Sequence, residues 1–232
     1  APLALELAAW GIKDPRELAW LDAPPAAAWG SGLQLLKALG ALEPSGSVTA
    51  MGRAMARLPL HPRLSRLMLK AQEVGCLRLG ADLAALLVER DIFRQGAEDR
   101  LLAGPDVSER VDALQRWRKG KVADGTSDPS ALKAVERTSK QLLRLIPGVR
   151  EDPRSLAEPV QISHLLLSAY PDRICKRREE GGGRFVHVQG RGVRLSLDSH
   201  LGSSPYIIAV FVDAGEKNEG FVHIAAPVSE DL

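Results

Sequence analysis

The chain has 232 residues, enough for one large domain or for two or three small ones. Hydrophobic residues make up 45% and charged residues 26%, which is typical of a globular protein that buries a core. The net charge is only +2, so the average surface does not indicate a nucleic-acid binder and any such site must be local. Every apolar run is short and interrupted by charges, which excludes a membrane span.

The cysteines and histidines do not predict a metal site. Cys76 and Cys175 lie far apart, and no Cys/His spacing resembles a zinc site. Two lone buried thiols fit a reducing compartment, so we expect a cytoplasmic protein. The chain begins at Ala1 within a helical pattern, without an initiator Met or a secretory signal pattern, so we expect it to be part of a longer protein.

Residues 1–60 predict a winged-helix domain. An apolar opening helix ends near Gly11, a short helix over about 14–20 begins at Asp14-Pro15, and a third helix begins after Asp22 and ends at Gly40. Segment 42–48, with Ser45-Gly46 inside it, predicts a small β-wing. Thr49 then caps a helix that runs through Met55.

The charges of this first domain balance, since it has five cations and five anions. The cations are Lys13, Arg16, Lys37, Arg53 and Arg57, and the anions are Glu6, Asp14, Glu17, Asp22 and Glu43. A DNA-reading winged helix needs a basic recognition helix, but the third helix carries only Lys37. We therefore expect this domain to pack against other domains.

Residues 61–170 predict an all-helical bundle. A helix begins at His61-Pro62, because proline at the first turn has a preset φ and needs no hydrogen bond to its nitrogen. Gly75 ends this helix and another spans about 77–90. Asp106 begins a further helix, Asp128-Pro129 begins a long one that stops at Pro147-Gly148, and an apolar helix covers 158–169. The polar segments 91–105 and 119–128 between them are expected to be loops.

Residues 171–232 predict a small β module, because the apolar period changes from helical to two. Strands are expected at 185–188, 193–197, 206–212 and 221–225, separated by glycine-rich turns. Four or more strands in a segment of this size suit a small barrel.

Several ordered motifs resemble DEAH/DExH-type helicases. The stretch Leu58-Pro59-Leu60-His61-Pro62-Arg63-Leu64-Ser65-Arg66-Leu67-Met68-Leu69 resembles the junction between their winged-helix and ratchet domains. The segments around Trp20-Leu21-Asp22, Leu36–Leu42 and Val48–Arg53 resemble their winged helix. Ala169-Tyr170-Pro171-Asp172-Arg173-Ile174 resembles the entry to their last β module, and Gly190–Leu195 looks most like the bacterial HrpB-type branch.

This resemblance implies a fold that is mainly α with a C-terminal β module. The expected order is a winged helix (1–60), a ratchet-like helical bundle (61–170) and a small OB-like barrel (171–232). HrpB-type proteins are expected to continue beyond the equivalent of Leu232, so the barrel is expected to be incomplete.

The resemblance further implies the C-terminal accessory region of an ATP-dependent RNA helicase, with two RecA-like motor domains upstream. The chain has no G-x-x-x-x-G-K-[ST] loop and no Asp-Glu-x-His box, so by itself it should not hydrolyse ATP. ATP and Mg²⁺ are expected in the upstream motor. Single-stranded RNA or DNA and the motor domains are the expected partners, and no membrane is.

The densest basic segment, 172–194, is the first candidate nucleic-acid site. Its seven cations and three acids give a local charge of +4 in a chain of total +2. OB modules hold single strands with basic grooves and nearby rings, and Phe185 and His187 share one strand face where they could stack on bases. The expected contacts are Arg173, Lys176, Arg177, Arg178, Arg184, Phe185, His187, Arg191 and Arg194.

The first helix of the bundle is the second candidate. Arg63, Arg66 and Lys70 are three or four residues apart and share one side of it. In the family this bundle forms a wall of the strand channel, so sequence-independent phosphate contacts are expected. Tyr170 and Trp117 are interpreted as core or domain-interface residues.

Two other function classes stay open from the residues alone. One is a transcriptional regulator whose winged helix reads DNA. The other is a scaffold that only binds proteins.

Overall fold

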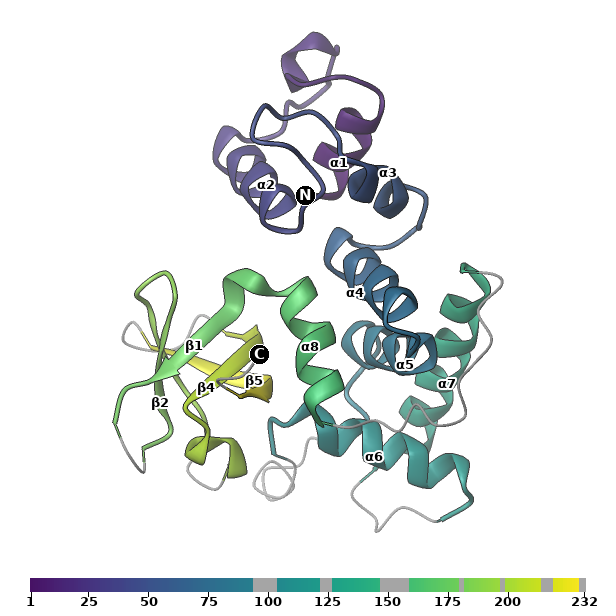
Figure 1. The fold of residues 1–232 in the computed structure, drawn as a ribbon, viewed down its shortest axis with the longest axis vertical. Coiled ribbons are helices and arrows are strands. Elements are labelled where there is room, and N and C mark those ends of the chain that lie inside the picture. Colours follow the sequence, from purple (N-terminus) through teal and green to yellow (C-terminus); the bar gives the residue numbers. More distant parts are fainter. Residues whose placement is uncertain are drawn as a thin grey trace.

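The structure is a computed structural model that describes residues 1–93, 104–121, 127–146, 159–179, 182–196, 199–213 and 219–229. Three units follow one another along the chain (Figure 1). A small helical unit lies at the top, a bundle of five helices lies below it, and a β-barrel lies beside the bundle. Helix α8 stands between the barrel and the other helices of the bundle.

The first unit contains α1 (Pro2–Ala9), η1 (Pro15–Glu17), α2 (Ala26–Ala38) and α3 (Ala50–Ala56). The expected wing is a single antiparallel bridge between Leu42 and Val48. Thr49 Oγ1 accepts the Gly52 N–H at 2.9 Å, which confirms the predicted cap of α3.

The helix expected over 14–20 is wrong, because only the 3₁₀ turn η1 forms there. Asp14 and Glu17 close a capping box around this turn. The Trp20 indole N–H then donates to the Pro15 carbonyl at 2.6 Å and folds the chain back on the turn.

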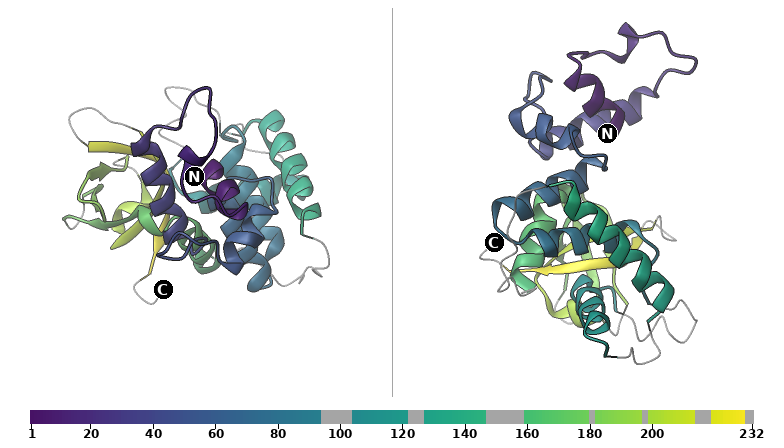
Figure 2. Two further views of the ribbon diagram at one scale, coloured as in Figure 1. Left: turned by 90° about the horizontal axis from the view of Figure 1, so that it is seen from above. Right: turned by 90° about the vertical axis from the view of Figure 1, so that its right-hand side faces the viewer.

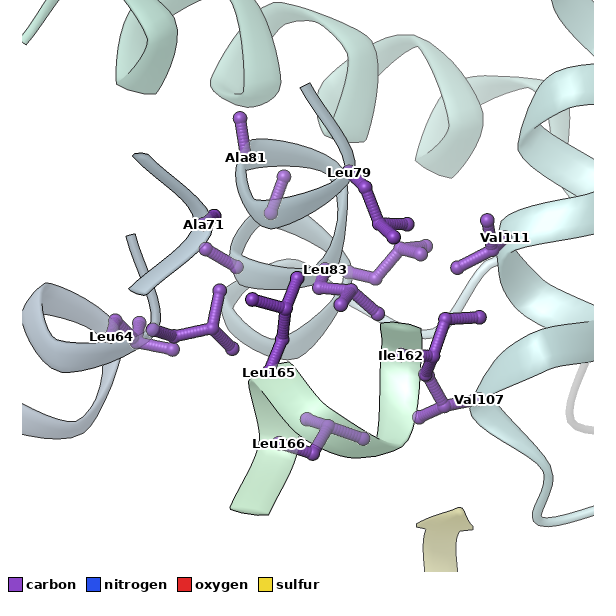
Figure 3. Close-up of a cluster of buried hydrophobic side chains, with 14 of the residues drawn as sticks. Leu64, Ala71, Leu79, Ala81, Leu83, Val107, Val111, Ile162, Leu165 and Leu166 are labelled. Carbon is purple, nitrogen blue, oxygen red and sulfur yellow. The ribbon is translucent and has the colours of Figure 1, made fainter. Parts of the chain in front are cut away.

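The bundle contains α4 (Pro62–Glu73), α5 (Leu77–Val88), α6 (Val107–Arg118), α7 (Pro129–Arg144) and α8 (Pro159–Ala169). The predicted starts are confirmed by hydrogen bonds, since Asp106 caps α6 and Asp128 caps α7. Gly75, at φ +75°, ends α4 in the left-handed conformation that glycine allows. Leucine, isoleucine, valine and alanine side chains from α4, α5, α6 and α8 interlock in the shared core (Figure 3).

A buried ionic network joins three of these helices. Asp82 of α5 is 2% exposed and accepts two hydrogen bonds from the Arg118 guanidinium of α6, at 2.6 and 2.7 Å. The Ser139 hydroxyl of α7 donates to the same carboxylate at 2.5 Å. Arg118 also pairs with Glu136 of α7 at 2.6 Å, so every member of the network has a partner.

The barrel contains β1 (Ile174–Arg177), β2 (Arg184–His187), β3 (Gly192–Arg194), β4 (Tyr206–Val212) and β5 (Glu219–Val228), with η3 (Pro171–Arg173) before it and η4 (His200–Ser203) before β4. The strands close in the order β1-β2-β3-β5-β4, with β3 and β5 parallel. This is the OB-like module that was expected. The five described strands close on one another.

Strand β1 was not predicted. It has four residues and carries Lys176 and Arg177, so its composition reads as a charged loop. Ile174 and Cys175 nevertheless place this segment in the barrel. Cys175 is fully buried and pairs with residues of both neighbouring strands, β2 and β4. Part of the basic segment therefore lies on a strand.

Arg63 fixes the entry to the barrel onto α4. Its guanidinium donates to both carboxylate oxygens of Asp172 at 2.6 Å and to the Ala169 carbonyl at 2.8 Å. It also lies 4.8 Å from the centre of the Tyr170 ring. The side chain is only 10% exposed, so the expectation that Arg63 contacts phosphates is wrong.

Among the described helices, none combines the length and the apolar character needed to cross a membrane.

Replacing Asp82 should destabilise the bundle strongly. Asp82→Ala leaves the Arg118 guanidinium partly buried without its main partner, so we expect the free energy of unfolding to fall by about 3 kcal/mol. Urea unfolding followed by circular dichroism measures this. The control is Asp112→Ala on the exposed side of α6, which should change the value by less than about 0.5 kcal/mol. Equal effects of the two changes would show that the network adds nothing.

Replacing Asp172 should destabilise the chain in a pH-dependent way. Burial alone would raise the pKa of Asp172, but the Arg63 hydrogen bonds outweigh it and hold that pKa below the ordinary value of 3.8. The pair therefore contributes its full stability above about pH 4 and loses it as the pH falls through the lower pKa of the folded state.

We expect Asp172→Asn to cost about 2 kcal/mol at pH 7 and progressively less below about pH 4. Urea unfolding at several pH values measures the difference from the unchanged chain. Asp22→Asn, at an exposed position of the first unit, is the control. A loss that is the same at pH 7 and pH 3 would contradict the ionic role of Asp172.

Candidate nucleic-acid interface

The outer surface of the barrel has a covered part and an open part. Ile208 and Val210 of β4 and Ala226 and Val228 of β5 belong to the same buried core as the bundle helices. Within the described residues, β2, β3, the last two residues of β4 and the first four of β5 contribute nothing to that core. A ligand of the barrel therefore has this open end available.

Three side chains lie next to one another across the open face. Arg184 of β2 is opposite Arg194 of β3, and Arg194 is the register partner of Phe221 on β5. The Arg194 guanidinium stands 5.4 Å from the centre of the Phe221 ring. A cation over a ring keeps both groups oriented while the guanidinium N–H groups stay able to donate.

The row continues into an aromatic cluster. The His223 ring lies 5.0 Å from the Phe221 ring and 5.5 Å from the Phe211 ring, at tilted to edge-on angles. His223 Nε2 is 3.1 Å from Asp213 Oδ2, and Phe211 is 57% exposed. We call Arg184, Arg194, Phe211, Phe221 and His223 the barrel row.

Gly220 lets β4 and β5 approach closely beside this cluster. A Cβ atom at this position would stand 2.5 Å from a Val212 methyl and 2.9 Å from the Asp213 carbonyl oxygen. Asp213 also accepts the Phe221 N–H at 2.9 Å, which fixes the start of β5. The close approach of β4 and β5 at Gly220 thus keeps the rings of Phe211, Phe221 and His223 near one another.

Other residues of the basic segment surround the row or are used by the fold. Glu219 stands 3.8 Å from Arg178 and 3.9 Å from Arg184, long ion pairs at exposed side chains that leave both cations accessible. Arg177 donates to the Ser203 carbonyl at 2.6 Å and so holds η4 in place. Lys176 is exposed on β1, Arg173 is half-buried in η3, and Arg191 follows the turn between β2 and β3.

Phe185 does not fit the expectation that it stacks on bases. It is fully buried among Cys175, Val193 and Ile207 inside the barrel. His187, on the same strand, is half-buried, and its Nδ1 accepts the Gln189 N–H at 3.1 Å. Burial, helped by nearby Arg173, lowers the pKa of His187.

Arg66 and Lys70 belong to a separate surface on α4. Lys70 pairs with Glu73 at 2.8 Å. Arg66 is half-buried, and its Nη1 atom is buried with no hydrogen-bond partner within the described part of the chain. A buried guanidinium nitrogen without an acceptor is costly, so an acceptor from a ligand or another domain would stabilise it.

The sequence interpretation missed Phe211, Phe221 and His223. The signal was present, because Phe221 and His223 are two residues apart and flank the inward-facing Val222. Within the described ranges, no group of three or more His, Cys, Asp or Glu side chains could hold a metal ion.

Two family models match the chain next to each other. Residues 32–60 match the winged-helix part of the helicase associated domain (HA2), and residues 61–132 match its ratchet-like part. The boundary between the two matches lies at the His61-Pro62 start of α4.

Curated relatives and solved structures agree with these matches. The chain is 31% identical over 207 residues to the ATP-dependent RNA helicase HrpB of Escherichia coli K12, covering 89% of this chain and 22% of that protein. It is 29% identical to the pre-mRNA-splicing factor ATP-dependent RNA helicase prp22 of Schizosaccharomyces pombe, covering 97% of this chain and 21% of that protein. The crystal structure of the E. coli DExH-box NTPase HrpB superimposes with a TM-score of 0.73 at 26% identity, covering 99% of this chain and 25% of that one.

The chain thus spans about a fifth of the length of these curated relatives. Both helicase-associated domains occur in it in the family's order, and an OB-like barrel follows them. The chain therefore carries the two helicase-associated (HA2) domains, and over nearly all of its length it is similar to the C-terminal region of HrpB-type DEAH helicases.

Proposed function

We propose that this region grips single-stranded RNA for an ATP-dependent RNA helicase. The strand is held by contacts to phosphates and by stacking on bases, while ATP hydrolysis in other domains moves it. This work is mechanical and electrostatic, and no covalent step is assigned to the chain.

The barrel row is the observation that carries this proposal. Arg184 and Arg194 offer guanidinium groups to phosphates, and Phe211 offers an exposed ring beside Phe221 and His223. Cations next to rings on an OB-like surface suit a single strand of any sequence, because every base has a face that can stack. Arg173, Lys176, Arg178 and Arg191 flank this row and would extend the basic path.

The α4 surface supports a second phosphate contact. The half-buried Arg66 guanidinium and the neighbouring Lys70 amino group would both donate to a phosphate oxygen. Because Lys70 already has Glu73 as a partner, we expect a smaller contribution from this surface than from the barrel row.

The winged-helix unit would pack on the upstream motor domains. Trp10 and Leu21 are 70% and 101% exposed, and apolar side chains this open are suited to an interface within a larger protein. ATP and Mg²⁺ would bind in those motor domains. A DNA-reading role is not favoured, because the single cation of α2, Lys37, donates its hydrogen bond to the Pro44 carbonyl at 3.0 Å.

Changes in the barrel row should separate charge from stacking. Arg184→Gln combined with Arg194→Gln should weaken binding of a labelled oligouridylate. The slope of log affinity against log salt should also fall by about 1.4, at about 0.7 per phosphate contact of a single strand. Phe211→Ala should cost about 1–3 kcal/mol of binding free energy without changing that slope. Fluorescence anisotropy over a series of salt concentrations measures both quantities.

The matched control removes two cations from the first unit, with Lys13→Gln and Arg57→Gln, both at exposed positions. It should leave affinity and slope nearly unchanged. Absence of salt-dependent RNA binding, or equal losses in the control and the barrel variant, would refute the gripping role of the barrel row. Such a result would favour a scaffold that binds only proteins.

A further inference from the structure

A third basic surface lies on α7, apart from the barrel row and from the α4 surface. Four cations follow one another at intervals of four, three and four residues, which places them along one side of a helix. They are Lys133, Arg137, Lys140 and Arg144. At a rise of about 1.5 Å per residue the stripe is about 16 Å long.

These cations line a groove between α7 and α6. The groove has a volume of about 320 Å³, and Trp117, Glu136 and Gln141 complete its lining. Trp117 packs against the bundle core but remains half-exposed, so one part of the indole faces the groove. Trp117 is thus more than the core or domain-interface residue that the sequence suggested.

The charge of the groove is positive because its one acid is already neutralised. Glu136 pairs with Arg118 at 2.6 Å and with Lys140 at 3.0 Å. Burial opposes its charge, but these two partners outweigh burial and lower the pKa of Glu136. No described carboxylate forms an ion pair with Lys133, Arg137 or Arg144.

The fold does not need these cations. The opposite side of α7 supplies the buried residues Ala131, Leu132, Val135, Ser139 and Leu142, which pack into the bundle. Three neighbouring cations without an ion-pair partner among the described residues repel one another, which costs stability unless an anion joins them. A stripe of this kind beside a half-exposed indole suits a polyanion that also carries rings.

We propose that the α6–α7 groove binds single-stranded RNA as a further contact, separate from the barrel row and from the α4 surface. The phosphates lie along Lys133, Arg137 and Arg144, and a base stacks on Trp117. The choice of RNA as the occupant rests on the proposed function, and the charge and the indole in the groove are independent of it.

A hydrogen-bonded link holds the groove in a fixed position relative to the barrel. The Ala225 N–H of β5 donates to the Pro105 carbonyl at 2.8 Å, and Asp106, the cap of α6, forms a parallel bridge with Ala225. Ala225 is two residues beyond His223, so the strand that carries the aromatic cluster also fixes the start of the helix that carries Trp117. One RNA molecule that reaches both surfaces would gain from their combined binding.

The test uses the 232-residue chain and a fluorescein-labelled oligouridylate. The groove variant combines Lys133→Gln, Arg137→Gln and Arg144→Gln. The slope of log affinity against log salt should fall by about 2, since three phosphate contacts of about 0.7 each are removed. The matched control removes three exposed cations next to the groove, with Arg116→Gln, Lys119→Gln and Lys121→Gln, and should keep the original slope.

Stacking on Trp117 has its own readout. The other three tryptophans, Trp10, Trp20 and Trp29, all lie in the first unit. RNA should therefore quench the fluorescence of the unchanged chain more than that of Trp117→Phe, a change that keeps a ring against the core. Thermal unfolding confirms that each variant is folded.

The outcomes for the groove and for the barrel row are distinct. If barrel variants weaken RNA binding while the groove variant behaves like its control, this inference is overturned and the proposed function stands. If only the groove variant weakens binding, the groove stands and the role of the barrel row is overturned. Binding of polyglutamate as tight as that of the RNA would assign the groove to an acidic protein surface and would overturn the RNA assignment.

Discussion

The contact between barrel and bundle requires parts of two strands to be apolar on both sides. Ile207, Ala209, Val222 and Ala225 fill the inside of the barrel, while Ile208, Val210, Ala226 and Val228 face the helices. A strand segment with both faces buried has no room for a polar or charged ligand contact. On β4 and β5, only the residues at the open strand ends are therefore available to a ligand. The rings of Phe211, Phe221 and His223 lie at these ends.

Directional bonds hold this contact in one arrangement. Arg63 joins α4 to Asp172 at the entry to β1, and the Ser163 hydroxyl of α8 donates to the Pro227 carbonyl of β5 at 2.6 Å. The Pro105–Ala225 hydrogen bond joins the start of α6 to the same strand. The right-hand view of Figure 2 shows the first unit extending away from the bundle and the barrel. These bonds tie the barrel and its entry turn to three helices of the bundle, α4, α6 and α8.

The sequence predicted helices well because their ends are local. Asp106, Asp128 and Thr49 each accept a backbone N–H two or three residues away, so the signal and its effect lie in one window. The same local signal predicted a helix at η1, and this prediction was wrong. The capping box formed there, but no apolar stripe followed that would extend the turn into a helix. Strand β1 was missed because its partners are in β2 and β4, and neither is visible from the Ile174–Arg177 window.

The candidate site was only partly predictable. Period-two alternation places Phe185 and His187 on one face, but it does not say whether that face points into the barrel. Phe185 fills the barrel interior, and the aromatic cluster of Phe211, Phe221 and His223 lies on β4 and β5, which the basic segment does not include. The position of Arg184 and Arg194 in the row depends on the register of β2 with β3, which local sequence does not determine.

The cations that remain for a ligand are those that the fold has not already used. Three buried or half-buried arginines pair with carboxylates that are distant in the sequence. The separation is 109 residues for Arg63 and Asp172, 36 for Arg118 and Asp82, and 19 for Arg110 and Asp91. A buried guanidinium must have such a partner, whereas an exposed one gains little from any pairing. A count of charges along the chain does not separate buried, paired cations from exposed ones. For this reason a net charge of +2 conceals local basic surfaces. Once the buried pairs are set aside, exposed cations remain at several places, and those on the barrel row, on α4 and on α7 lie on three surfaces joined to the same bundle.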